Sequence, residues 1–359
     1  FEAAANKLPG LLATTGYLPD GLPALREIIA QRYSDRGLPT DPGQIVVTSG
    51  AQGAISLLGR ALLQPGQRII VEGTSWPHAP ESFSSIGARL TSMPVGETPW
   101  DTTSLGEAVR STAHAAAYII PDFHNPTGAV MSDDERGAWA RELTRHDIVP
   151  IVDESLREVN LDGVELPPSF ASYDPRAILV DSMSKSYWGG LRIGWARVPL
   201  DLVMPLIQAR MNHDLGTPGF EQLVVAELLT DGGQTAAAGR AKLRAGRDHL
   251  LSELVTALPE IVAPCPGGGS SLWVTLPDRM SSRLTSAAAR HGLVLTPGPR
   301  FFTSPVPVSE RHLRLPFMPA LDILSEAVKR LRLAYDEVVG TRETHGAPVD
   351  TSDTLELIA

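Results

Sequence analysis

The sequence predicts an α/β fold, in which a large domain built on a mostly parallel sheet of seven strands is followed by a smaller α+β domain. Up to about residue 200, short β-branched segments alternate with amphipathic helical patterns. This alternation is typical of parallel strands joined by crossover helices, with helices on both faces of the sheet. After residue 200 the alternation stops and helical patterns dominate, which indicates a second and smaller unit.

The predicted strands of the large domain are short runs rich in Val, Ile and Ala. They span residues 44–48, 68–72, 117–120, 148–152, 178–181 and 193–198, with a weaker one at 88–93. Between the first two, Ile55, Leu58 and Leu62 fall on one face of a predicted helix at 51–63. Because ligands of such sheets bind at the carboxyl ends of the strands, the residues that directly follow each strand are the candidates for a site.

The second unit has a different order of elements. A long helix at 236–258 and a turn at 264–269 precede the predicted strands 270–276 and 312–316 and a closing helix at 320–335. We therefore expect the remnant of an N-terminal arm at 1–14, a large domain at 15–235, a small domain at 236–339 and an acidic tail at 340–359. Composition alone predicts that the tail is flexible.

Composition also excludes several classes of function. The chain of 359 residues carries a net charge of −10, so we expect it to repel nucleic acids and anionic membranes. We expect no membrane segment, since no apolar run approaches roughly 18 residues.

Cys265 is the only cysteine, which rules out an intramolecular disulfide and suits the cytoplasm. Because the chain begins at Phe1 rather than Met, we expect further residues upstream.

One lysine stands apart from the others. Lys185 follows a predicted strand in the run Ser182-Met183-Ser184-Lys185, whereas the other three lysines lie in helical patterns. A lysine at a strand end, flanked by hydroxyls and glycines, is suited to form an imine with an aldehyde cofactor. This short pattern also occurs by chance, so its surroundings must decide.

Two polar residues follow neighbouring predicted strands. Asp153 follows strand 148–152, where a buried carboxylate suits a pyridinium nitrogen, although a helix cap is the ordinary role of a single Asp. Asn125, in His124-Asn125-Pro126-Thr127-Gly128, has an amide suited to a phenolate oxygen, although Asn is also common in turns.

Other strand ends offer a place for a phosphate and a flat ring. Residues Gly50, Ala51 and Gln52 open a predicted helix, and free amides at a helix start favour an anion. Arg192 supplies a charge that binds phosphate in a bidentate manner. Trp76 is suited to stack on a ring, although buried core aromatics are more common. Ser182 and Ser184 complete the predicted phosphate site.

Taken together, these stretches resemble fold-type-I aminotransferases of class I/II, and especially the aminotransferase-like domain of the MocR/GntR regulators of actinobacteria. The resemblance spans roughly residues 10 to 335. It is carried by Gly16-Tyr17, Gly21–Arg26, Thr48–Gln52, His124–Gly128, Asp153-Glu154, Ser182–Lys185, Gly190–Trp195 and His312–Phe317, in the order of the family.

The resemblance implies a pyridoxal 5′-phosphate (PLP) cofactor and no metal. Lys185 would bind PLP as an imine and then move the Cα proton, while Asp153 would contact the pyridine nitrogen and Asn125 the phenolic oxygen. The remaining implied cofactor contacts are Gly50, Ala51, Gln52, Ser182, Ser184 and Arg192 to the phosphate and Trp76 to the ring. Arg314, with Asn125, would bind the substrate, Arg314 gripping its α-carboxylate. Tyr17 would reach the cofactor of the partner subunit in a homodimer.

Two departures from the family pattern affect the substrate side. Relatives carry a tyrosine two or three positions after the pyridine aspartate, where this chain has Ser155 and Leu156. The phenolic oxygen would therefore lack one donor. The segment that precedes Gly16-Tyr17 in relatives, and lines the substrate entrance, is mostly missing before Phe1.

Three functions remain open on the sequence. The leading one is an aminotransferase that moves an amino group between an amino acid and a 2-oxo acid. The second is another PLP reaction, such as elimination, replacement or carbon–carbon bond formation in specialised metabolism. The third is an effector-sensing domain of a transcriptional regulator, whose DNA-binding part would lie upstream of Phe1.

Overall fold

The large domain of the computed structural model, which describes residues 1–96, 98–340 and 355–356, is built on a seven-stranded sheet. The strands are, in spatial order, β1 (Ile45–Thr48), β7 (Gly194–Arg197), β6 (Ile178–Ser182), β5 (Val149–Asp153), β4 (Ala116–Ile119), β2 (Arg68–Val71) and β3 (Arg89–Ser92). Only β7 runs against its neighbours β1 and β6. The mostly parallel sheet is confirmed, and each predicted strand end differs by at most one residue.

Helices cover both faces of the sheet because residues of the central strands alternate between two apolar clusters. In β6, Leu179 packs with one cluster while Ile178 and Val180 pack with the other. The first face is covered by α2 (Pro23–Asp35), α5 (Thr102–Ser111), α6 (Asp133–Arg145) and α8 (Gly219–Leu229). The second face is covered by α3 (Gly50–Leu62), α4 (His78–Ser85) and α7 (Leu200–Met211).

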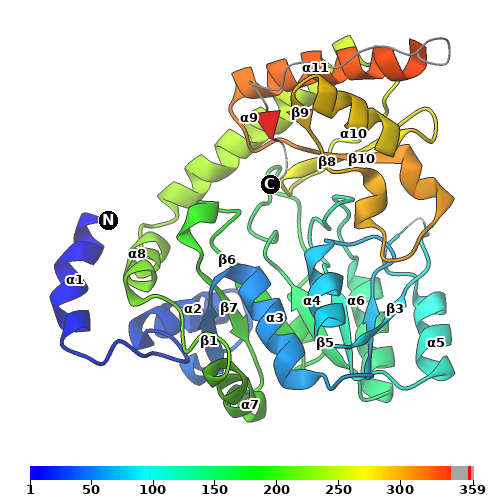
Figure 1. Ribbon diagram of the computed structural model, residues 1–359. Helices are drawn as coiled ribbons and strands as arrows, with labels where there is room; N and C mark the ends of the chain where they lie inside the picture. The colour runs from blue at the N-terminus through cyan, green and yellow to red at the C-terminus, as the bar shows by residue number, and fades with distance from the viewer. Residues whose placement is uncertain (97, 341–354, 357–359) are drawn as a thin grey trace.

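The small domain packs helices against a short antiparallel pair of strands (Figure 1). Its elements are α9 (Gln234–Ala257), β8 (Ser271–Thr275), α10 (Ser281–Arg290), β9 (Leu293–Val294), β10 (His312–Pro316) and α11 (Leu321–Gly340). The closing helix runs five residues past its predicted end at 335, because Val338 still packs into the core of this domain.

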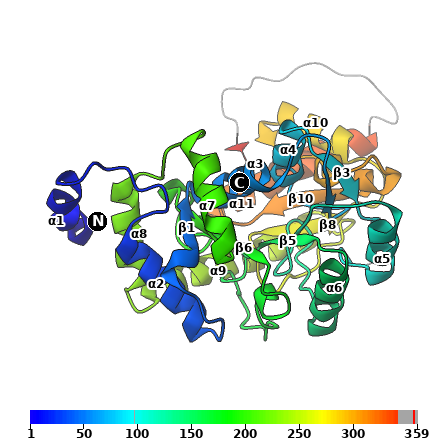
Figure 2. The same cartoon turned by 90° about the horizontal axis from the view of Figure 1, so that it is seen from below.

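The sequence did not predict α10 or the N-terminal helix α1 (Glu2–Leu12). In α10 the buried residues Leu284, Ala287 and Ala288 form a narrow apolar stripe among serines, which weakens the periodic signal. Figures 1 and 2 both show α1 at one end of the molecule, beside α8. There Leu11 packs against Gly219 of α8.

Contacts between the two domains lie at the carboxyl ends of the strands. Phe123 and Leu156, which follow β4 and β5, belong to the apolar core of the small domain. After β2, Thr74 forms an antiparallel bridge with Phe302, and the Ser75 amide donates to the Phe301 carbonyl (2.8 Å). The small domain therefore covers the edge of the sheet at which a ligand is expected.

Most of the predicted acidic tail, residues 341–354 and 357–359, lies outside the described residues. Of its described residues, Gly340 ends α11, and Leu355–Glu356 form β11, which pairs in parallel with β9. In the part of the chain that the structure describes, no helix is both long and apolar enough to cross a bilayer.

Candidate active site

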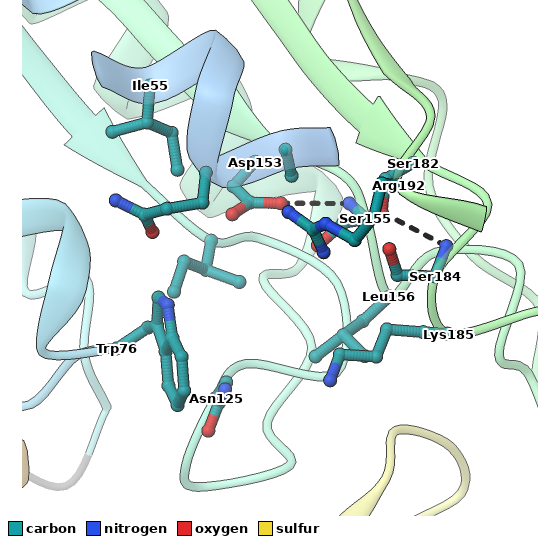
Figure 3. A pocket seen from close by; sticks show the side chains of 13 residues that line it. Ile55, Trp76, Asn125, Asp153, Ser155, Leu156, Ser182, Ser184, Lys185 and Arg192 are labelled. Carbon is teal, nitrogen blue, oxygen red and sulfur yellow. Dashed lines mark hydrogen bonds between the residues drawn. The ribbon is translucent and has the colours of Figure 1, made fainter. Parts of the chain in front are cut away.

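A cavity of about 160 Å³ opens where the strand ends of the large domain meet. It brings together residues that lie more than 100 positions apart in the sequence, and most of the predicted site residues are among them. Its lining consists of Ala51, Gln52, Ile55, Trp76, Ile120, Asn125, Asp153, Ser155, Leu156, Ser182, Ser184, Lys185 and Arg192 (Figure 3).

The only lysine of this cavity, Lys185, follows β6 and is half-buried. Burial lowers the pKa of its ammonium group to about 8, helped by the positive charges of Arg314 and Arg192 and opposed by Asp153. An ordinary lysine has a pKa near 10.4, so Lys185 is neutral, and hence nucleophilic, in a far larger fraction of molecules at neutral pH. In Figure 3 its amine and the Asn125 amide point into the same space beside the Trp76 ring.

The carboxyl group of Asp153, the last residue of β5, is buried and accepts two hydrogen bonds. The Tyr118 hydroxyl donates to Oδ2 (2.9 Å), and the Ser155 amide donates to Oδ1 (2.9 Å). Burial nevertheless raises the pKa of this carboxyl. A cation placed against Asp153 would offset that desolvation and keep the group ionised.

Sequence reasoning missed Tyr118. It lies in the middle of β4, whose register pairs it with Ile151, two residues before Asp153 on the same face of β5. An aromatic residue within an apolar strand gives no sign of a polar role on its own. Only the adjacency of β4 and β5 brings the Tyr118 hydroxyl to Asp153.

One end of the cavity is formed by the start of α3 and by Arg192. The helix has no side-chain cap, so its first amides are available to an anion. Gly50 adopts φ +77°, and a Cβ at this position would lie 2.9 Å from Arg192 Nη2. Arg192 itself is left-handed (φ 52°), and its Nη2 donates to the Ser49 carbonyl (3.0 Å). Glycine at position 50 therefore leaves room for a guanidinium directly above a helix start.

Two side chains of the cavity, Gln52 and Asn125, carry amide groups. Gln52 Nε2 donates to the His78 carbonyl (3.1 Å) and to Ser82 Oγ (2.7 Å), which turns this side chain toward α4. Only its backbone amide can then serve an anion at the start of α3. The oxygens of both side chains, Gln52 Oε1 and Asn125 Oδ1, are buried without a hydrogen-bond partner among the described residues, as expected for a site that awaits a ligand.

Arg314 lies beside the cavity rather than in its wall. It extends from β10, is 2% exposed, and its Nε donates to Ser271 Oγ (2.9 Å). Its guanidinium lies 5.7 Å from the Trp76 ring and 5.8 Å from the Phe301 ring. Burial lowers the pKa of Arg314 to about 10, so an anion brought to this place would find a poorly solvated cation.

Two residues that the sequence analysis singled out, Tyr17 and Leu156, need a separate description. Tyr17, on the loop after α1, is 68% exposed and is not part of the cavity wall of its own chain. Leu156 lines the cavity, yet its side chain is 5% exposed and packs in the small-domain core with Phe123. An apolar side chain thus occupies the position at which relatives were expected to offer a hydroxyl.

A mostly parallel seven-stranded sheet with a smaller domain over its strand ends, and a lysine there, defines the class of fold-type-I PLP-dependent transferases. The sequence model of the aminotransferase class I and II family matches residues 13–331. The chain belongs to this family and is an aminotransferase.

Similar proteins include enzymes and regulators. The chain is 30% identical to a 2-aminoadipate transaminase of Thermus thermophilus over 328 residues, 89% of this chain and 79% of that one. It is 29% identical to the HTH-type transcriptional regulator YdfD of Bacillus subtilis over 290 residues, 79% of this chain but only 59% of that one.

Among solved structures, the fold is similar to α-aminoadipate aminotransferase LysN from Thermus thermophilus, complexed with N-(5′-phosphopyridoxyl)-L-leucine. The TM-score is 0.85 at 27% identity, with 95% of this chain and 89% of that chain covered.

Proposed function

We propose that this aminotransferase binds PLP at Lys185 and moves an amino group from an α-amino acid to a 2-oxo acid. The observation that carries the proposal is the meeting of Lys185, Asp153 and Asn125 in one cavity, with the pKa of the lysine lowered to about 8. When bound, PLP supplies a conjugated ring that withdraws electrons from the substrate's α-carbon.

The donors of the cavity fit a phosphorylated pyridine. A phosphate suits the uncapped start of α3, at the amides of Gly50, Ala51 and Gln52, because the Arg192 guanidinium lies close to Gly50. The hydroxyls of Ser182 and Ser184 add neutral donors beside it. The unpartnered Asn125 Oδ1 is an acceptor, so its amide nitrogen is the group to donate to a phenolic oxygen while Oδ1 serves the substrate.

The other residues act on the ring and on the substrate. Asp153 would hold the positive charge of a protonated ring nitrogen, which in turn would keep its carboxyl ionised. Trp76 would stack on the ring. The Lys185 amine is the base that removes the proton from the substrate's α-carbon and returns it, since it is the one amine among the lining residues.

The attachment point is tested by labelling. Purified protein with PLP is expected to absorb in the visible range, and borohydride should then fix the cofactor on Lys185. Peptide mapping by mass spectrometry distinguishes this lysine from Lys7, Lys242 and Lys329. A label on any of those three would contradict the proposal.

Arg314 is proposed to bind the α-carboxylate of the substrate, because a guanidinium offers a carboxylate two parallel hydrogen bonds that lysine cannot reproduce. Arg314→Lys is expected to lower kcat/KM for α-amino acids by about 2–4 kcal/mol, or about 30- to 1000-fold. Amines without a carboxylate should lose far less, and the Kd for PLP should not change. Steady-state kinetics on such substrate pairs measure the difference; equal losses on both would make Arg314 structural.

A homodimer is part of the same proposal. Tyr17 is exposed in the single chain, and the resemblance assigns it to the phosphate of the neighbouring subunit. We also propose that the protein acts in the cytoplasm and contacts no nucleic acid through the chain given. A net charge of −10 supports the last point.

Two other functions would use the same cavity. Elimination, replacement or carbon–carbon bond formation needs the same lysine, and Leu156 in place of a hydroxyl is the feature that favours such chemistry. An effector-sensing domain of a MocR-type regulator is favoured by the similarity to YdfD. Product analysis by mass spectrometry, with amino acid and 2-oxo acid supplied together, separates turnover by transamination from both.

A further inference from the structure

A second buried carboxylate, Glu72, lies directly after β2 and outside the cavity wall. Its side chain is fully buried and accepts hydrogen bonds at both oxygens. Trp100 Nε1 (2.8 Å) and the Ile120 amide (2.8 Å) donate to Oε1, and Ser75 Oγ donates to Oε2 (2.9 Å). The Trp100 indole and the Ile120 amide can only donate, so Oε1 is an acceptor, and the Ser75 hydroxyl supplies a donor to Oε2.

The fourth contact of the Glu72 side chain is with His124, the residue before Asn125. His124 Nε2 lies 3.2 Å from Glu72 Oε2, and the Trp100 and His124 rings pack edge to face. On the other side of the imidazole, Nδ1 lies 2.8 Å from Thr127 Oγ1, which also accepts from the Ala129 amide (3.3 Å). The donors and acceptors balance if Nε2 carries the proton and the Thr127 hydroxyl donates to Nδ1.

These bonds fix a short loop as one unit. Within residues 124–129 the His124 amide donates to the Ala129 carbonyl (2.8 Å) and the Gly128 amide to the His124 carbonyl (2.6 Å). Asn125 follows His124 and faces the cavity (Figure 3). On the side of the loop that faces away from the cavity, the His124 imidazole contacts the Glu72 carboxylate.

Glu72 also links this loop to the small domain. The Thr303 hydroxyl donates to the Glu72 carbonyl (2.9 Å), next to the Thr74–Phe302 bridge. The partners of Glu72 therefore come from four separate segments, and three of them, those of Ser75, of Ile120 with His124, and of Thr303, border the cavity or the domain contact. A carboxylate that served only the core would not need to gather groups at this boundary.

We propose that Glu72 is a positioning residue, which through His124 fixes the direction of the Asn125 amide toward the cofactor. The proposal rests on the function proposed above, because it assigns Asn125 to the cofactor's phenolic oxygen. A hydrogen-bond donor at that oxygen stabilises its negative charge. This stabilisation matters most after the lysine linkage has lost its proton, because the positive charge beside the oxygen is then gone. Disturbing the donor should therefore raise the pH midpoint of the visible absorption band.

The variant Glu72→Gln tests this with little change of volume. Its Oε1 can still accept from Trp100 and Ile120, but its NH₂ group now faces the His124 Nε2 donor, where the acceptor Oε2 of Glu72 stood before. In the holoenzyme we expect the midpoint to rise by about one pH unit, the effect of one hydrogen bond. We expect kcat to fall by about tenfold, with PLP still attached to Lys185.

A double variant shows whether the effect passes through Asn125. Asn125→Ala should raise the midpoint in the same direction, and adding Glu72→Gln to it should move the midpoint no further than about 0.3 unit. The control is Glu158→Gln, which neutralises another mostly buried carboxylate, one bound by Arg32 and Arg36 away from the cavity. It should leave the midpoint unchanged.

A second route covers the case in which Glu72→Gln does not fold. His124→Phe keeps a ring against Trp100 but removes both side-chain bonds, and it should raise the midpoint equally. Unchanged midpoints in the folded variants, or a shift that persists in full without Asn125, would overturn the role of Glu72. Absence of a visible band from the wild-type protein would instead overturn the proposed function itself.

Discussion

Lys185→Ala is expected to lower kcat for transamination by about a factor of ten thousand, the upper range for loss of a positioned base. Lys185 is the one residue of the cavity lining that carries an amine, so no second amine is available to take over the proton transfer. The pKa of Lys185, lowered to about 8 by burial, suits this amine to act both as a nucleophile and as a proton carrier near neutral pH. Steady-state turnover of wild-type and variant protein, measured with the same substrates, gives the ratio.

The matched control is Lys242→Ala, which removes an exposed lysine of α9 and should leave kcat unchanged. PLP should still bind to Lys185→Ala with measurable affinity, because the start of α3 and Arg192 remain. Its absorption band should change, since the linkage to the protein is gone. Turnover within tenfold of the wild type would show that Lys185 is not the base.

Asp153→Ala is expected to lower kcat by about a hundred- to a thousandfold, the usual effect of removing a preorganised charge from an active site. Without the carboxylate a ring nitrogen loses the partner that keeps it protonated, and the ring withdraws electrons less strongly. The Tyr118 hydroxyl would also lose its buried acceptor. Asp153→Glu keeps the charge and should lose less activity.

Two measurements separate this effect from a loss of fold or of cofactor. Thermal unfolding with and without PLP reports stability, and equilibrium titration reports the Kd for PLP in each variant. Tyr118→Phe is a useful companion, because it removes one hydrogen bond from Asp153 and keeps the charge. If both Asp153 variants bound PLP and turned over at the wild-type rate, the assignment of Asp153 to the ring nitrogen would be wrong.

Much of the fold and several site residues could be predicted because their signals are local. The alternation of strands with amphipathic helices fixes the class of sheet, and the carboxyl-end rule then points to the residues after each strand. Lys185, Asp153 and Asn125 all stand at such ends, and the structure brings them into one cavity. The sheet order and the single antiparallel strand β7 were not read from this pattern.

The sequence by itself thus determined the class of fold, the lysine and the positions of the polar strand ends. The tertiary structure decided what each of these groups touches: Tyr118 against Asp153, Glu72 against His124, and Arg314 beside Trp76. The physical reason is that a hydrogen bond depends on distances of a few ångströms, while these partners lie 35 or more residues apart. Strand order and domain packing set those distances, and neither leaves a local pattern in the chain.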